Sequence, residues 1–152
     1  MNLARLSPEQ TQLLSEAPVG RLATASATGA PHVIPVCFAS DGQYIYSVLD
    51  GKPKRAALTR LRRVRNLLAN PQVALLVDHY EADWSRLWYL LITGAAELLG
   101  EDGEDEDKEG KEREEAIGLL RQKYPQYRDM DIDGNPVIRI TPQRVVSWGG
   151  GS

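Results

Sequence analysis

Basic side chains gather where a strand-like segment gives way to a helix-like one. Lys52, Lys54 and Arg55 closely follow the β-rich segment Tyr44–Leu49, and no acidic residue interrupts positions 52–65. Backbone N–H groups and the positive dipole end at a helix start favour an anion, and basic side chains beside them add charge-assisted hydrogen bonds to a phosphate. We therefore expect a phosphate-binding loop at Lys52, Lys54 and Arg55, although its spacing matches no Walker motif.

Four further arginines continue this basic run into the helix-like segment. They are Arg60, Arg62, Arg63 and Arg65. A basic run on a helix is usually a solvated face, and we expect that role for all four. Nucleic acid is the competing partner for a basic cluster, but the sequence pI of about 5.4 opposes it and no nucleic-acid-binding motif is present.

Other site chemistries find little support in the sequence. Cys37 is the only cysteine, which excludes a disulfide framework and a cysteine zinc cluster, and it is expected to be a small buried residue of a strand. His32 and His79 lack metal-ligand spacing, so we predict no metal site and assign them structural or surface roles. Neither a G-x-S-x-G nucleophile elbow nor a G-x-G-x-x-G dinucleotide motif occurs.

The chain has 152 residues, 42% hydrophobic and 26% charged, which predicts one globular domain. No apolar run is long enough for a membrane helix and the first ten residues lack a signal-peptide core, so a cytoplasmic protein without membrane contact is expected. The segment Glu101–Glu115 holds ten acids and three bases, a charge of −7 against +4 for the remainder. Such a block is expected to be a solvated loop or helix start.

The elements that must position the basic loop follow from turn and periodicity signals. Ser7-Pro8 with Gln10 predicts a capped helix. Turn signals at Thr28-Gly29 and Asp41-Gly42 predict a three-stranded antiparallel meander. Its strands are Val19–Ser26, His32–Ala39 and Tyr44–Leu49.

The second half of the chain predicts one helix on each side of two long strands. Ala57, Leu61, Val64 and Leu68 share a helix face. The strands are Gln72–His79 and Leu87–Leu99, the latter with a bulge at Gly94, and the later helix runs through Tyr124; Pro136–Thr141 and Arg144–Trp148 read as two last short strands. Together these elements predict a mainly β fold, a small antiparallel barrel with flanking helices.

The order of several short motifs resembles a known family. Val19–Thr24, Pro31–Phe38, Asp50–Arg55 and Arg65–Leu75 resemble the corresponding stretches of pyridoxamine 5′-phosphate oxidase-like flavin reductases. The run from Asp78 to Trp88 is similar to a branch of probable coenzyme F-420-dependent enzymes. The resemblance covers about residues 5–148.

This resemblance implies a split β-barrel that forms a homodimer, with two cofactor sites along the subunit interface. One domain would span 1–148, with an acidic insertion at 101–115 and a disordered tail at 149–152. The implied roles are a strand backbone against the cofactor ring, a phosphate grip, and side chains that approach from the partner or line the pocket. The strand backbone against the ring would be that of Val33, Ile34, Pro35 and Val36. The phosphate would be held by Ser47, Lys52, Lys54 and Arg55. Trp84, Arg86 and Trp88 would approach from the partner chain, and Trp148 would line the pocket.

The implied activity is hydride transfer to an unsaturated or quinone-like small molecule. Coenzyme F-420, a deazaflavin, is the favoured cofactor and FMN the alternative; Tyr80, Tyr46 and His32 are candidate proton donors. The arginine-rich C-terminal segment of true pyridoxamine phosphate oxidases is missing, which argues against vitamin B6 oxidation. A non-catalytic carrier of a flavin or tetrapyrrole-type ligand is the competing reading from another functional class.

Overall fold

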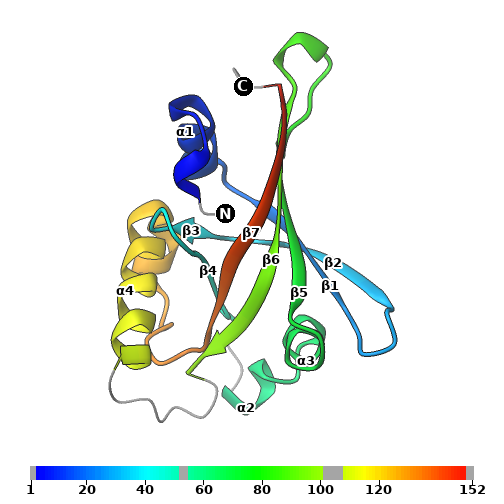
Figure 1. The fold of residues 1–152 in the computed structure, drawn as a ribbon. Helices are drawn as coiled ribbons and strands as arrows, with labels where there is room; N and C mark the ends of the chain where they lie inside the picture. Colours follow the sequence, from blue (N-terminus) through cyan, green and yellow to red (C-terminus); the bar gives the residue numbers. More distant parts are fainter. Residues whose placement is uncertain (1–2, 52–54, 101–107, 150–152) are drawn as a thin grey trace.

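A computed structural model describes residues 3–51, 55–100 and 108–149 of the chain. Within these residues, seven strands form one antiparallel sheet in the order β2-β1-β5-β6-β7-β4-β3, with helices around it (Figure 1). The mainly β fold predicted from the sequence is confirmed. The strands are β1 Gly20–Ala25, β2 Pro31–Val36, β3 Ala39–Ser40, β4 Ile45–Val48, β5 Gln72–His79, β6 Trp88–Leu99 and β7 Val137–Gly149. The helices are α1 Pro8–Glu16, α2 Arg55–Leu58, α3 Arg62–Ala69 and α4 Lys108–Lys123, with 3-10 turns η1 Leu3–Arg5, η2 Trp84–Arg86 and η3 Pro125–Asp129.

The two edges of the sheet meet because its first and last strands are consecutive in the chain. Only Cys37 and Phe38 separate β2 from β3, so the sheet curls into a half-barrel with a seam at this link. At the seam the Tyr124 hydroxyl accepts a hydrogen bond from the Phe38 N–H at 3.1 Å and lies 3.1 Å from the Phe38 carbonyl oxygen. A side chain thus satisfies backbone groups that leave the strand ladder.

Both hairpins of the predicted meander form, but its middle strand is interrupted at Cys37 and Phe38 and divided into β2 and β3. β1 pairs with β2, but β4 pairs with β3 and β7 rather than with β2. The chain leaves one sheet edge at Cys37 and joins the opposite edge two residues later. Tight turns fix which strands follow one another, whereas this crossing depends on the curl of the whole sheet.

Two other expectations need correction, while the bulge at Gly94 is confirmed. A Cβ at Gly94 would lie 2.1 Å from the Thr141 carbonyl oxygen, and the register between β6 and β7 shifts there. This irregularity lets β7 continue through Pro142, so the two predicted C-terminal strands are one. The predicted helix is split into α2 and α3, and Leu68 is exposed because α3 buries Val64 and Leu67 instead.

Two hydrophobic clusters cover the two faces of the sheet around β4 and β7. Ile45 and Ile138 face the barrel interior with α1 and α3, whereas Tyr46 and Val137 face α4. All four residues of β4 are buried because both of its faces are covered. The strand that carries Ser47 is therefore a rigid support for a site.

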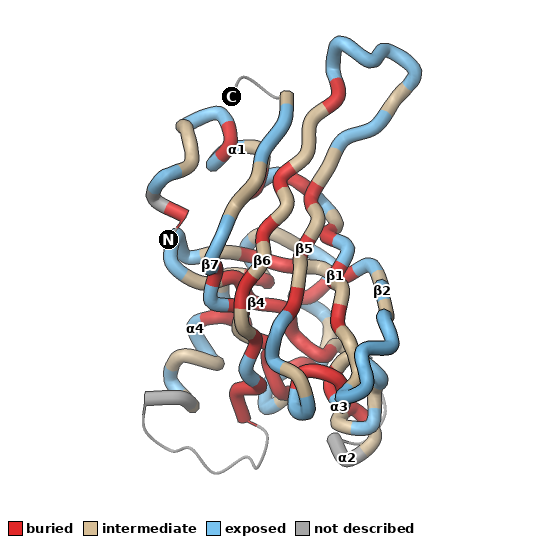
Figure 2. Tube along the Cα trace, turned by 45° about the vertical axis from the view of Figure 1, so that its right-hand side comes forward, coloured by how far each residue is buried: buried red, intermediate tan, exposed pale blue. Residues whose placement is uncertain are grey.

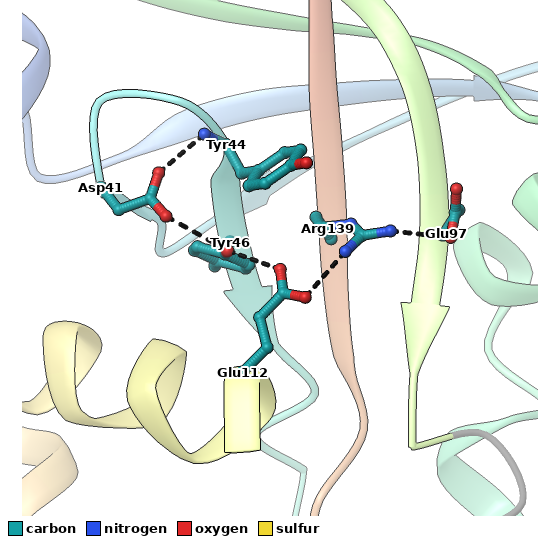
Figure 3. Close-up of polar contacts among 6 residues, drawn as sticks. All are labelled: Asp41, Tyr44, Tyr46, Glu97, Glu112 and Arg139. Carbon is teal, nitrogen blue, oxygen red and sulfur yellow. Dashed lines mark hydrogen bonds and ion pairs between the residues drawn. The ribbon is translucent and has the colours of Figure 1, made fainter. Parts of the chain in front are cut away.

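The helix α4 is fastened to the sheet by polar contacts as well (Figure 3). The Tyr46 hydroxyl donates to Glu112 at 2.7 Å, and the Arg139 guanidinium binds Glu112 at 2.8 Å and Glu97 at 2.9 Å. Glu112 belongs to the acidic segment, so the helical part of that segment contributes a specific anchor. Among the described residues, no helix is both long and apolar enough to cross a membrane.

Candidate functional site

A cavity of about 180 Å³ opens at the seam of the half-barrel. Residues from β2, the link after it, β4 and the start of α3 line it, which joins the two sheet edges to a helix start. They are Val19, Pro35, Val36, Cys37, Ser47, Val48, Asp50 and Arg63. Ser47 is 4% exposed, so its hydroxyl is held on a buried strand rather than on a mobile surface.

Arg63 owes its place in the cavity to how α3 packs. Val64 and Leu67 bury the apolar side of the helix, and the buried Asn66 amide donates to the Thr24 hydroxyl of β1 at 3.0 Å. Arg63 lies in the first turn of α3, which holds no acidic residue. The positive end of the helix dipole and the guanidinium therefore point their charge at one region.

The Arg63 guanidinium has no counter-ion among the described residues. Its Nε atom is buried without a hydrogen-bond partner, and no described carboxylate lies within ion-pair distance. Burial lowers the pKa of Arg63, while the charge of Asp50 and the Tyr127 side chain oppose that shift. A half-buried cation with unused donors suits an anionic ligand.

The carboxylate of Asp50 is turned toward Tyr127. The Tyr127 hydroxyl donates to it at 2.5 Å, and the Asn135 amide donates to the neighbouring Leu49 carbonyl at 2.7 Å. Burial, followed by this hydrogen bond, raises the pKa of Tyr127 well above its usual range. Because η3 holds Asp50 in this way, the carboxylate lines the cavity without pairing with Arg63.

The structure brings three of the predicted site residues together in this cavity. Pro35, Val36 and Ser47 line it, Ile34 packs against the barrel core, and Val33 faces outward with 60% of its surface exposed. The predicted phosphate residues Lys52 and Lys54 lie outside the described residues. Arg55 begins α2, a few positions before Arg63, and its side chain is not described.

The side chains expected to approach from the partner chain, and Trp148, which was expected to line the pocket, lie on or beside the β5–β6 hairpin. Its exposed tip projects at the opposite end of the molecule from α3 (Figures 1 and 2). Trp84 and Arg86 are exposed there, and Trp88 packs against the core at the start of β6. Trp148 is 51% exposed and stacks on Tyr89 with ring centroids 6.1 Å apart. Within one chain, the hairpin tip and the cavity are separate.

Sequence reasoning missed Arg63, Asp50 and Tyr127 as parts of the site. Arg63 was expected to be solvated with its neighbours, and Arg60, Arg62 and Arg65 are indeed exposed. The acid-free first helical turn after the basic loop is the signal that singles out this region, but it does not choose between Arg62 and Arg63. Cys37 is also only partly buried, because it faces the cavity.

Comparisons with known proteins agree with this architecture. A family model described as pyridoxamine 5′-phosphate oxidase matches residues 6–149. A 5a,11a-dehydrotetracycline/5a,11a-dehydrooxytetracycline reductase of Streptomyces rimosus is 30% identical over 131 residues, 86% of this chain and 73% of the relative.

Two solved structures share the fold at lower identity. The heme storage protein HutZ of Vibrio cholerae has a TM-score of 0.67 at 19% identity, covering 97% of this chain and 96% of that one. An F420 reductase has a TM-score of 0.63 at 22% identity, covering 93% and 98%. With the family match over nearly the whole length and the seven-stranded half-barrel, the chain belongs to the pyridoxamine 5′-phosphate oxidase family of split barrels.

Proposed function

We propose that this chain is a cytoplasmic oxidoreductase that binds a flavin-type cofactor at the interface of a homodimer. Coenzyme F-420 is the favoured cofactor and FMN the alternative. The substrate proposed is an unsaturated or quinone-like small molecule. The observation that carries the proposal is the seam cavity, where a buried serine and an arginine lie beside a helix start, the arginine having no counter-ion in the part of the chain that the structure describes.

The donors of this cavity fit the phosphate of such a cofactor. Ser47 supplies a hydroxyl, Arg63 supplies guanidinium N–H groups, and the first turn of α3 adds the positive end of its dipole. Lys52, Lys54 and Arg55 remain predicted contributors from the neighbouring loop. Pro35 and Val36 would form the apolar support for the part of the cofactor that follows the phosphate.

The bound cofactor would supply the hydride chemistry, and the chain would supply binding, orientation and exclusion of water. The rigid strand β4 fixes the position of Ser47, while α3 fixes that of Arg63. Asp50 is kept from neutralising Arg63 by its hydrogen bond to Tyr127. The chain thus holds an anion site in which Arg63 is not ion-paired with the nearby Asp50 carboxylate.

A second copy of the chain would complete the site. The cavity of about 180 Å³ is smaller than the roughly 300–1,000 Å³ typical of small-molecule sites, so one chain encloses only part of a cofactor. Val33, Tyr80, Trp84 and Trp148 leave large apolar surfaces exposed. Contact between two copies would cover such surfaces and bring Trp84, Arg86, Trp88 or Trp148 toward the partner's cofactor.

The relatives support the reductase reading and one alternative. The Streptomyces relative is named for reducing a dehydro, that is unsaturated, compound, and an F420 reductase shares the fold. HutZ, named as a heme storage protein, favours a second candidate function in which the barrel carries a tetrapyrrole without turnover.

Side-by-side titration of the purified chain with FMN, coenzyme F-420 and heme tests these choices. We expect the titration to show saturable binding of F-420 and light scattering to show a dimer. In an activity assay with a panel of quinones and enones, we expect some members to be reduced. Replacing Arg63 with Met should weaken cofactor binding about ten- to hundredfold, while the exposed neighbour control Arg62→Met should change it little. The loss of cofactor affinity should likewise be larger in Lys52→Ala, Lys54→Ala and Arg55→Ala than in Arg60→Ala.

Three results would contradict the proposal. Tight heme binding without flavin or F-420 binding would favour the carrier. A monomer that still binds the cofactor tightly would remove the interface site. Equal losses from Arg62→Met and Arg63→Met would show that diffuse charge, not the seam cavity, attracts the phosphate.

A further inference from the structure

A second, larger groove lies between α1, the β3–β4 hairpin and the end of α4. Its volume is about 530 Å³, within the range of small-molecule sites. Leu3, Leu6 and Leu14 form its N-terminal wall, and Leu119 lies on α4 opposite them. No acidic side chain is among the described residues that line it. The described lining is therefore mainly apolar and carries no negative charge, and its uncharged polar residues are Thr11, Ser15, Ser40 and Gln122.

Lys123, the last residue of α4, is among the residues that line this groove, and its ammonium lies buried beside the groove rather than in it. Its Nζ atom has no hydrogen-bond partner among the described residues. The ammonium lies 3.7 Å from the centroid of the Phe38 ring and 5.3 Å from that of Tyr124. Aromatic faces stabilise a cation only in part, so the three N–H donors remain available to an acceptor.

We propose that this groove binds an amphiphilic monoanion, an aliphatic carboxylate whose chain lies along the leucines and whose carboxylate pairs with Lys123. The apolar walls match the chain and the single cation matches the single charge. Binding of the carboxylate would require rotation about the flexible lysine stem, which would carry the ammonium from the Phe38 ring to the groove. The occupant differs from a phosphate-bearing cofactor, which calls for several donors such as those around Arg63.

The environment of Lys123 agrees with an acceptor that is brought by a ligand. Burial lowers the pKa of Lys123 to about 8, and the nearby Cys37 only partly opposes this shift. A carboxylate beside the ammonium would stabilise its charged form. Each buried methylene of the ligand chain would add about fourfold in affinity, so affinity should rise with chain length.

Calorimetric titration with octanoate, octanol and octyltrimethylammonium tests the proposal. We expect one octanoate per chain, bound at least about tenfold more tightly than octanol, with no binding of the cation. Lys123→Met should lower octanoate affinity about tenfold and leave octanol unchanged. The matched control is Lys111→Met, because Lys111 lies exposed on the same helix.

Variants with a second mechanism keep the test decisive. If circular dichroism shows that Lys123→Met does not fold, Lys123→Gln replaces it with an uncharged polar side chain. Leu119→Trp should fill the groove and abolish binding of both octanoate and octanol. Equal binding of octanoate and octanol, or full octanoate affinity in Lys123→Met, would overturn the proposal. Dissociation of an oligomer by Leu119→Trp, without octanoate binding to the wild type, would assign the groove to a second copy instead.

Discussion

Two partly buried arginines have opposite surroundings in this fold. Arg139 of β7 binds Glu112 and Glu97 with its two terminal nitrogens and lies 4.9 Å from the Tyr44 ring (Figure 3). Arg63 of α3 has no described carboxylate within ion-pair distance. The buried Nε atom of each arginine has no hydrogen-bond partner within the described ranges, so the two residues differ in the contacts of their terminal nitrogens.

The pKa values of the two arginines are shifted in opposite directions. Burial opposes the charge of Arg139, but Glu112 and Glu97 more than offset it, and its pKa is raised. Burial of Arg63 is offset only in part by Asp50 and Tyr127, and its pKa is lowered. A satisfied buried charge holds elements together, whereas an unsatisfied one costs the fold free energy and is best explained by a ligand.

The largest effect on stability is expected at Arg139. Arg139→Met leaves Glu112 without its cation and weakens the anchor of α4, so we expect a loss of about 1.5–3 kcal/mol in the free energy of unfolding. Urea denaturation measures this loss, and titration should show cofactor affinity unchanged. Arg63→Met is the matched control and should cost no stability, because it removes an uncompensated charge. A comparable loss in both variants would mean that Arg63 is a structural residue.

A smaller effect, on cofactor affinity, is expected at Asp50, which has both a structural contact and a place in the cavity. It lines the cavity but gives its carboxylate to Tyr127. Asp50→Asn removes a negative charge beside the proposed phosphate, so cofactor affinity should rise about two- to fivefold, or roughly 0.5–1 kcal/mol. Weaker binding in Asp50→Asn would show instead that Asp50 orients Arg63. The fluorescence or absorbance titration used for the wild type distinguishes the two outcomes.

Local signals in the sequence predicted much of the fold. The Ser7 capping box, the strand Gln72–His79 and the bulge at Gly94 follow from neighbours in the chain, and each is confirmed. The pairing of β4 with β7 joins residues about ninety positions apart, and no local pattern specifies it.

The candidate site was predictable only in outline for the same reason. Ser47, Pro35 and Val36 came from a family resemblance, and they meet in one cavity. The choice of Arg63 over Arg62 depends on which side of α3 faces β1, which the Asn66–Thr24 hydrogen bond settles. Likewise, the Tyr127–Asp50 bond spans 77 positions and leaves no mark on either segment.

Lys123 is a third buried cation, and its expected effect, on how the free energy of unfolding changes with pH, is the smallest of the predicted effects. Its pKa is about 8 in the folded chain because of burial, against an ordinary value of 10.5. Below pH 8 Lys123 is protonated in both the folded and the unfolded chain, and the folded chain is destabilised by the full cost of burying the charged ammonium. Between pH 8 and pH 10 the unfolded chain binds more protons, so the free energy of unfolding should rise with pH.

After allowance for solvent screening, we expect this rise to be about 1 kcal/mol or less. Cys37 and Tyr124 also face the ammonium, but burial raises the pKa of Tyr124 to about 12, which keeps its titration above this window. Urea denaturation at pH 7.5, 8.5 and 9.5 should show the rise in the wild type and in Lys111→Met, and its loss in Lys123→Met. Saturating octanoate should also flatten it, because a bound carboxylate returns the pKa of Lys123 toward its ordinary value. An identical pH dependence in wild type and Lys123→Met would place the ammonium in water and remove the contrast with Arg139.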